Sequence, residues 1–183
     1  MAFRLFAALR PPPAVRAQLA ATMAGVPGAR WQDDEQLHLT VRFIGEVDGA
    51  QAEDVALALE QVHAAAPSVR LAGVGSFAHR GRTEALWAAV APHDALAALH
   101  LKVDAACVRA GLAPERRAYL PHITLARFGR GGGRGPEVER WLRDTAGLAS
   151  PAFACAHLLL YRSHLGRERA TYEAVARWPL QPA

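Results

Sequence analysis

Lysine is almost missing from this chain of 183 residues: Lys102 is the only one, and arginine supplies every other basic side chain. The formal net charge is +4, which mildly favours a polyanionic partner such as RNA. Alanine and glycine are abundant as well, so the codon usage of a GC-rich genome is a competing explanation for part of the arginine content. The charge balance therefore points toward RNA without establishing it.

Cysteine and long hydrophobic runs are also scarce. Cys107 and Cys155 lie far apart in apolar surroundings, which is typical of reduced, packed thiols in a cytosolic protein rather than of a disulfide. The apolar start, Met1–Leu9, is short, contains Arg4 and runs into three prolines, so we expect a first strand and not a signal peptide. No uninterrupted apolar stretch approaches the ~20 residues that span a bilayer. We expect a cytoplasmic protein without a membrane partner.

The sequence also lacks the usual spacings of metal ligands and of phosphate loops. No His-x-x-x-His or Cys-x-x-Cys pattern occurs. Gly129–Gly135 is rich in glycine but has no Gly-Lys-Ser/Thr ending. Its Arg130 and Arg134 are candidates for steering RNA phosphates, and a disordered connector is the alternative. His79, in a polar loop, is a similar candidate. We therefore expect no metal and no cofactor.

Two short strings nearly repeat each other, and each places a histidine two residues before a threonine. They are His-Leu-Thr-Val-Arg-Phe at His38–Phe43 and His-Ile-Thr-Leu-Ala-Arg-Phe at His122–Phe128. Residues i and i+2 of a strand point to the same side, so each string presents an imidazole and a hydroxyl together. Two such strands facing each other would provide acid–base groups and hydrogen-bond donors for an anion, with phosphate the obvious candidate.

The order of the predicted elements suggests a duplicated fold. Residue alternation predicts strands at Phe3–Leu9, Leu37–Ile44, Val69–Phe77, Ala85–Val90, Ile123–Phe128, Phe153–Tyr161 and Ala170–Trp178. Helical spacing and capping residues predict helices at Ala14–Met23, Ala50–Ala66, Asp94–Ala110 and Glu137–Ala146. Pro13 is suited to the first turn of the first helix, and Asp48 is the expected N-cap of the second. The expected fold class is α+β: a single domain over residues 1–183, made of two intertwined, pseudo-symmetric lobes. Each lobe is an antiparallel sheet with flanking helices, and the active-site cleft lies between them.

After the threonine, the alternation of strand faces places the arginines of the two strings differently. Arg42 shares the face of His38 and Thr40, whereas Phe43 falls on the opposite, apolar face. In the second string Arg127 is out of phase with His122. A bulge or a strong strand twist would be needed to bring Arg127 back toward the site, and a surface arginine is the alternative.

These residues resemble the signature of the two-histidine (2H) phosphoesterases, and within them the LigT-like RNA 2′,3′-cyclic phosphodiesterases. The paired motifs stand here as His38-Leu39-Thr40-Val41 and His122-Ile123-Thr124-Leu125. Weaker matches in the expected order extend the resemblance over nearly the whole chain; they are Phe43–Val47, Gly75–Phe77, Leu86-Trp87, Pro121, Ala126-Arg127, Leu160, Ser163, Gly166 and Tyr172.

The resemblance implies metal-independent hydrolysis of a terminal 2′,3′-cyclic phosphate to a 2′-phosphate. His38 would be the proton donor and His122 the proton acceptor. Thr40, Thr124 and Arg127 would bind the phosphate. One neutral and one cationic imidazole would give a bell-shaped pH profile. The family name also implies reversible 2′–5′ RNA ligation at the same histidines.

Five further side chains are weaker candidates for the cleft. Phe43, Phe77 and Trp87 could stack on a base, with core packing as the alternative. Ser163 and Tyr172 would line the cleft by resemblance. The expected partners are RNA ends with a 2′,3′-cyclic phosphate, tRNA fragments among them, and the expected state is a monomer. The alternatives are a 2H phosphodiesterase for another cyclic or 2′–5′-linked nucleotide, and a non-catalytic RNA- or nucleotide-binding module.

Overall fold

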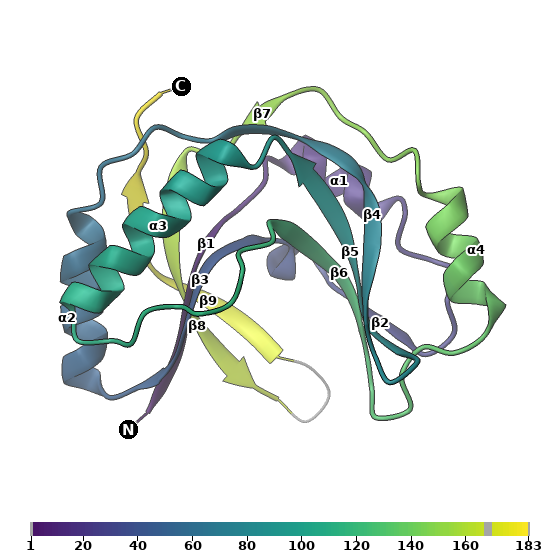
Figure 1. Cartoon of the computed structure of the whole chain (residues 1–183), viewed down its shortest axis with the longest axis horizontal. Coiled ribbons are helices and arrows are strands. Elements are labelled where there is room, and N and C mark those ends of the chain that lie inside the picture. The colour runs from purple at the N-terminus through teal and green to yellow at the C-terminus, as the bar shows by residue number, and fades with distance from the viewer. Residues whose placement is uncertain (1, 167–169, 183) are drawn as a thin grey trace.

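The strands of this protein form two arms that meet where the strands of the two His-x-Thr motifs pair (Figure 1). The computed structural model describes residues 2–166 and 170–182. Its strands are β1 (Phe3–Leu9), β2 (Ala29–Trp31), β3 (Leu39–Val47), β4 (Ser68–His79), β5 (Arg82–Ala91), β6 (His122–Phe128), β7 (Phe153–Ala154), β8 (His157–Leu165) and β9 (Ala170–Pro179). Its helices are α1 (Pro13–Ala20), α2 (Gly49–Glu60), α3 (Asp94–Arg109) and α4 (Pro136–Asp144), with a 3-10 turn at Asp34–Gln36.

The sheet is antiparallel, in the order β7-β4-β5-β6-β3-β1-β8-β9, and β2 pairs with the free side of β6. One arm therefore contains β3, β1, β8 and β9, and the other contains β6, β5, β4, β7 and β2. Helices α2 and α3 cover the outer side of the first arm, and α4 lies outside the second (Figure 1). This mixed architecture confirms the predicted α+β class.

The core lies between the helices and the outer side of the sheet. Fully buried leucines of α2 and α3, such as Leu59, Leu96 and Leu99, pack against inward-facing residues of the strands. Cys107 and Cys155 are free and buried, and burial raises the pKa of the Cys107 thiol to about 11. The prediction of two packed thiols is confirmed. In the described part of the chain no helix is long and apolar enough to cross a membrane.

Element types were predicted better than element ends. Pro13 begins α1 and the Asp48 side chain caps α2, as predicted, but α2 ends at Glu60 and not at the predicted Ala66. The predicted strand Phe153–Tyr161 is split into β7 and β8. The short strand β2 was missed, since three residues without alternation carry no sequence signal.

Candidate active site

The two motif strands touch at a single backbone pair, Leu39 of β3 with Ile123 of β6. Both side chains are fully buried, so the neighbouring positions on each strand point to the opposite, open side of the sheet. The antiparallel register through this pair places His38 level with Thr124 and Thr40 level with His122. The two motifs are thus related by a local twofold, with an imidazole and a hydroxyl from each strand on one face.

A β-bulge follows the threonine of the first motif. The register of β3 with β1 passes from Ala8–Thr40 directly to Ala7–Arg42, so Val41 is the extra residue. Val41 and Arg42 are both buried, and Phe43 is exposed. The bulge therefore reverses the alternation: Arg42 points to the core side and Phe43 to the side of the histidine.

The second motif has the same bulge at the same place. The register of β6 with β5 passes from Trp87–Thr124 to Leu86–Ala126, so Leu125 is the extra residue. Leu125 and Ala126 are both buried, and Arg127 is exposed. This is the bulge that strand parity required for Arg127 to reach the site. Arg127 in the second motif and Phe43 in the first hold corresponding positions.

The assignment of Arg42 to the cleft was wrong. Its side chain is 7% exposed, and its Nε donates to Asp104 Oδ1 at 2.7 Å. Nη2 donates to the carbonyl of Ala113 at 2.7 Å, and Glu115 lies 3.6 Å from Nη1. Arg42 thus pairs with α3 and the segment that follows it, on the far side of the sheet from His38. The reason is the bulge at Val41, which moved Arg42 out of phase with His38.

The side chains of Tyr119 and His100 bind the backbone of the first bulge. The Tyr119 hydroxyl donates to the carbonyl of Thr40 at 3.0 Å, and His100 Nδ1 donates to the carbonyl of Val41 at 2.7 Å. The His100 and Tyr119 rings are stacked, with centroids 4.3 Å apart. Bulged backbone groups lack regular sheet partners and would be costly to bury unpaired. These two side chains therefore hold the Thr40 backbone in the position that presents its hydroxyl to the cleft.

Both motif histidines are held in the same tautomer. His38 Nδ1 donates to the carbonyl of Gln36 at 2.7 Å, and His122 Nδ1 donates to the carbonyl of Leu120 at 2.8 Å. Because a carbonyl can only accept, each Nδ1 carries the proton and each neutral ring has its lone pair on Nε2. His38 Nε2 lies 3.1 Å from the Thr40 hydroxyl. The reactive nitrogen of each ring thus faces the open side of the sheet.

The pKa values of both histidines lie below the ordinary value. Burial, with smaller contributions from the nearby Arg127 and His122 charges, lowers the pKa of His38 to about 4. Burial and the Arg127 charge also lower the pKa of His122. Both shifts favour the neutral form of the imidazole over the cationic form.

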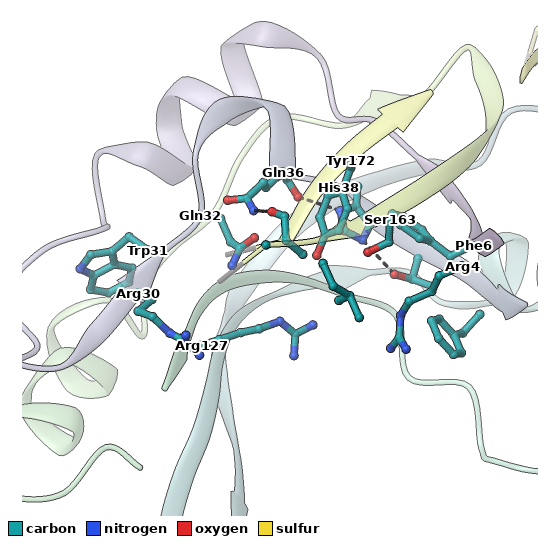
Figure 2. Close-up of a pocket in the computed structure, with 15 residues that line it drawn as sticks. Arg4, Phe6, Arg30, Trp31, Gln32, Gln36, His38, Arg127, Ser163 and Tyr172 are labelled. Carbon is teal, nitrogen blue, oxygen red and sulfur yellow. Dashed lines mark hydrogen bonds between the residues drawn. The ribbon is translucent and has the colours of Figure 1, made fainter. Parts of the chain in front are cut away.

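A cavity of about 600 Å³ adjoins His38 (Figure 2). Four of the predicted residues besides His38 and Thr40 line it: Phe43, Arg127, Ser163 and Tyr172. Ser163 and Tyr172 face each other across β8 and β9. His122 and Thr124 lie outside this set, on the adjacent strand. The cavity also contains residues that the sequence analysis did not assign to the site: Arg4, Phe6, Arg30, Trp31, Gln32 and Gln36.

The signal for Arg4 and Phe6 was present in the sequence. They alternate with Leu5, Ala7 and Leu9 in β1, so parity alone separates them from the core. Which side of β1 faces the cleft depends on its pairing between β3 and β8, which the sequence did not reveal. The residues contributed by β2 and the following turn carried no comparable pattern.

Aromatic rings surround each histidine. The Phe6 ring lies 4.8 Å from the His38 ring, and Tyr172 meets it edge-on at 5.3 Å. The His122 ring is contacted by Phe77 at 4.9 Å and by Trp87 at 5.9 Å. Phe77 and Trp87 thus lie beside the second histidine and not in the cavity at His38. These rings are part of the surroundings that bury the two imidazoles.

Trp87 depends on a glycine on the neighbouring strand. Gly75 pairs with Trp87 across β4 and β5, and a Cβ on Gly75 would lie 2.3 Å from the indole. We expect Gly75→Ala to displace Trp87, to lower the free energy of unfolding by about 1–3 kcal/mol, and to weaken the packing around His122. Denaturant unfolding measures the first effect. Gly147→Ala is the matched control, because nothing lies within 4 Å of its Cβ position; equal stability losses in the two variants would contradict the expectation.

The open face of the sheet therefore combines two imidazole Nε2 atoms, two threonine hydroxyls and the Arg127 guanidinium. Arg4 and Arg30 add positive charge at the cavity walls (Figure 2). Hydroxyl and guanidinium donors that converge beside two neutral imidazoles suit a phosphate ester, whose oxygens accept hydrogen bonds while protons move. Within residues 2–166 and 170–182, no group of three or more His, Cys, Asp or Glu side chains is placed to hold a metal ion.

Known proteins share both the sequence pattern and the fold. The family model "2'-5' RNA ligase superfamily" matches residues 10–167. An RNA 2′,3′-cyclic phosphodiesterase of Geobacillus stearothermophilus is 33% identical over 86% of this chain, and the chain spans about half (49%) of that relative's length. The Aeropyrum pernix protein of the same name is 28% identical over 82% of this chain and 85% of its own length.

Solved structures agree with the fold. Escherichia coli LigT in complex with 3′-AMP superposes with a TM-score of 0.76 at 24% identity, over 98% of this chain and 99% of LigT. At this identity the likeness supports the fold alone. The sequence match, by contrast, covers most of the chain and contains both His-x-Thr motifs. The protein therefore belongs to the 2′–5′ RNA ligase superfamily, as the resemblance to the 2H phosphoesterases predicted.

Proposed function

We propose that this protein is an RNA 2′,3′-cyclic phosphodiesterase that converts a terminal 2′,3′-cyclic phosphate into a 2′-phosphate. The observation that carries the proposal is the pair of Nε2 atoms on one face, each fixed by an Nδ1–H bond to a carbonyl two residues earlier. The names of the relatives support the same activity. The complex of E. coli LigT supports a nucleotide as the bound molecule, because its ligand is 3′-AMP.

In the proposed reaction, water attacks the phosphorus in line with the ribose O3′. His122 accepts the proton of the water as the new P–O bond forms. His38, protonated, gives its proton to O3′ as the P–O3′ bond breaks, which leaves a 3′-hydroxyl and a 2′-phosphate. The roles of the two histidines follow the family resemblance, and the local twofold makes either assignment possible in geometry.

The phosphate-binding roles belong to Thr40, Thr124 and Arg127. The Thr40 hydroxyl already lies next to His38 Nε2, and Arg127 is close enough to lower the pKa of both histidines. Donors placed in advance where negative charge grows lower the barrier without reorganisation. Phe43, beside Arg4 with its ring centroid 4.9 Å from the guanidinium carbon, is proposed to bound the nucleoside together with Ser163 and Tyr172.

The proposal also covers the setting of the reaction. Its substrates are RNA ends such as tRNA fragments, with reversible 2′–5′ ligation at the same histidines. The acting form is a monomer in the cytoplasm, with residues 1–183 as one 2H domain of two intertwined lobes. The division of the sheet into two arms that share only the Leu39–Ile123 pair supports the two-lobe description.

A product assay tests the function. The protein is incubated with an oligonucleotide that ends in a 2′,3′-cyclic phosphate, in the presence of a chelator, and the product is identified by its resistance to a 3′-specific phosphatase. Formation of a 2′-phosphate is expected. A 3′-phosphate would contradict the proposed cleavage of the P–O3′ bond. Activity that is lost with chelator and restored by a metal ion would contradict the metal-independent mechanism. Tight binding of the oligonucleotide without turnover would identify a binding module.

The low histidine pKa values predict different pH profiles for kcat/KM and kcat. The proton donor His38 has a pKa of about 4 in the free protein, so kcat/KM should fall with rising pH well below pH 6.5. A bound phosphodiester is negatively charged and favours the cationic imidazole, which raises the pKa of both histidines in the complex. The alkaline limb of kcat should therefore lie at higher pH than that of kcat/KM. Coincident limbs in initial-rate measurements from pH 4 to 9 would contradict this.

A further inference from the structure

Arginines continue from the catalytic cavity along one rim of the second arm. A second cavity of about 500 Å³ shares Arg30 and Arg127 with the first. It is lined further by His79, Arg80, Arg82 and Arg130, with Glu84 as the acidic residue. A third, of about 490 Å³, shares Arg80 and Arg82 and adds Arg134, with Glu139 as its acidic residue. We name the surface formed by Arg30, Arg80, Arg82 and Arg130 the basic rim.

The basic rim is held in shape by the backbone. The β4–β5 hairpin and the glycine-rich segment after β6 are joined by two hydrogen bonds between Thr83 and Gly133, of 3.2 and 2.8 Å. The Arg82 guanidinium lies 3.4 Å from the carbonyl of Arg130, to which it donates. The glycine-rich segment is therefore an ordered part of the surface and not a free connector. Its Arg130 consequently has a defined position.

Two features of the rim oppose local stability. Arg30 of β2 stands directly opposite Arg127 of β6, and like charges in such a pair repel (Figure 2). Arg80 has a φ of +49° at the first place of the two-residue turn between His79 and Arg82. Asparagine is preferred there, because it tolerates the left-handed region. A polyanionic ligand along this surface would account for arginine at both positions.

We propose that the basic rim binds the phosphates of the RNA strand on the 5′ side of the nucleotide whose cyclic phosphate is cleaved. The inference rests on the proposed function and adds to it the path of the RNA strand and a dependence on its length: longer RNA chains are cleaved in preference to cyclic mononucleotides. The sharing of Arg30 and Arg127 between the first two cavities gives the strand a continuous path from the catalytic site to the rim. Phosphate contacts of this kind carry no base specificity, so the preference should be for length and not for sequence.

The test compares 2′,3′-cyclic AMP with an RNA hexamer ending in a 2′,3′-cyclic phosphate. In the wild type, kcat/KM should be higher for the hexamer and should fall more steeply with salt, by about 0.7 in the log–log slope for each phosphate contacted. The key variant is Arg80→Asn, which removes a charge while favouring the turn. We expect kcat/KM for the hexamer to fall about two- to tenfold. For 2′,3′-cyclic AMP, kcat/KM should stay unchanged, and the Tm of the variant should stay equal or rise.

Controls separate this inference from general effects of charge. Arg109→Gln removes an exposed charge from the outer helix α3 and should alter neither substrate. Arg82→Gln should reproduce the hexamer defect. A loss of the same size for both substrates in Arg80→Asn, or no loss for the hexamer, would overturn the proposal even if cyclic phosphate hydrolysis is confirmed.

Binding distinguishes failure of the rim from failure of the proposed function. If the wild type hydrolyses neither substrate, the function is wrong, and fluorescence anisotropy with a labelled RNA hexamer then tests the rim alone. Weaker hexamer binding by Arg80→Asn and Arg82→Gln than by Arg109→Gln would support the rim. Equal binding by all three variants would overturn it.

Discussion

Exchange of His122 for alanine is expected to lower kcat for hydrolysis of a 2′,3′-cyclic phosphate by about 10²- to 10⁴-fold, and His38→Ala by a similar factor. Each imidazole has its Nδ1 proton committed to a backbone carbonyl, so its Nε2 is the atom available to exchange a proton with the substrate. A water molecule in place of either imidazole would not be held in the position needed to transfer the proton. The two losses should not add in the double variant, because the two histidines serve one concerted step.

The chain contains a matched control for these variants. His63 has the same hydrogen bond from Nδ1 to the carbonyl two residues earlier, here Gln61 at 2.9 Å, but it is exposed after the end of α2. His63→Ala should therefore retain full activity. Full activity in His38→Ala or His122→Ala would contradict the two-histidine mechanism.

The pH dependence of the residual activity assigns the two roles. A missing proton donor removes the alkaline limb of the profile, and a missing acceptor removes the acidic limb. We expect His38→Ala to lose the alkaline limb and His122→Ala the acidic one. The opposite result would retain the mechanism and exchange the roles, which the local twofold at Leu39–Ile123 permits.

Arg127→Gln is expected to have the second largest effect, a fall in kcat of about 10²- to 10³-fold. The guanidinium is the cation that the bulge at Leu125 brings to the histidine face, and it would bind the non-bridging oxygens of the phosphate as charge accumulates. Arg127→Lys should recover little of this rate, because a single ammonium group cannot reproduce two parallel hydrogen bonds.

The same variant has a spectroscopic signature that does not depend on turnover. The charge of Arg127 contributes to lowering the pKa of His38 and of His122. Removing that charge should raise both values, and Arg127→Lys should keep them low. NMR titration of the histidine ring protons measures this directly. Unchanged pKa values in Arg127→Gln would place the guanidinium away from the site and contradict its proposed role.

Residues governed by local rules were predicted correctly. The pairing of His38 with Thr40 and of His122 with Thr124 on one face follows from the two-residue period of a strand. That rule needs no knowledge of neighbours, and the buried Leu39 and Ile123 provided its apolar side. The proline at the start of α1 and the Asp48 cap of α2 are local features of the same kind.

The prediction failed where a neighbouring strand intervenes. A bulge is a mismatch between two strands, so its position cannot be read from one of them. The bulges at Val41 and Leu125 turned Arg42 into a buried partner of Asp104 and brought Phe43 and Arg127 to the histidine side. The two motifs consequently differ at one corresponding position on the histidine side, where the first has Phe43 and the second has Arg127. The one-residue difference in the position of the arginines is not what distinguishes the two motifs.

The amino-acid order alone was enough to identify two strands with His-x-Thr motifs, their likeness to each other and the class of fold, because each depends on residues within one strand or helix. The contents of the cleft required the folded sheet. Arg4, Gln36 and Arg30 come from separate elements and meet His38 only through the pairing of β1, β2, β3 and β6. The low pKa of His38 likewise arises from burial in the folded sheet, where residues distant in the sequence such as Phe6 contact its ring, and no local pattern encodes this.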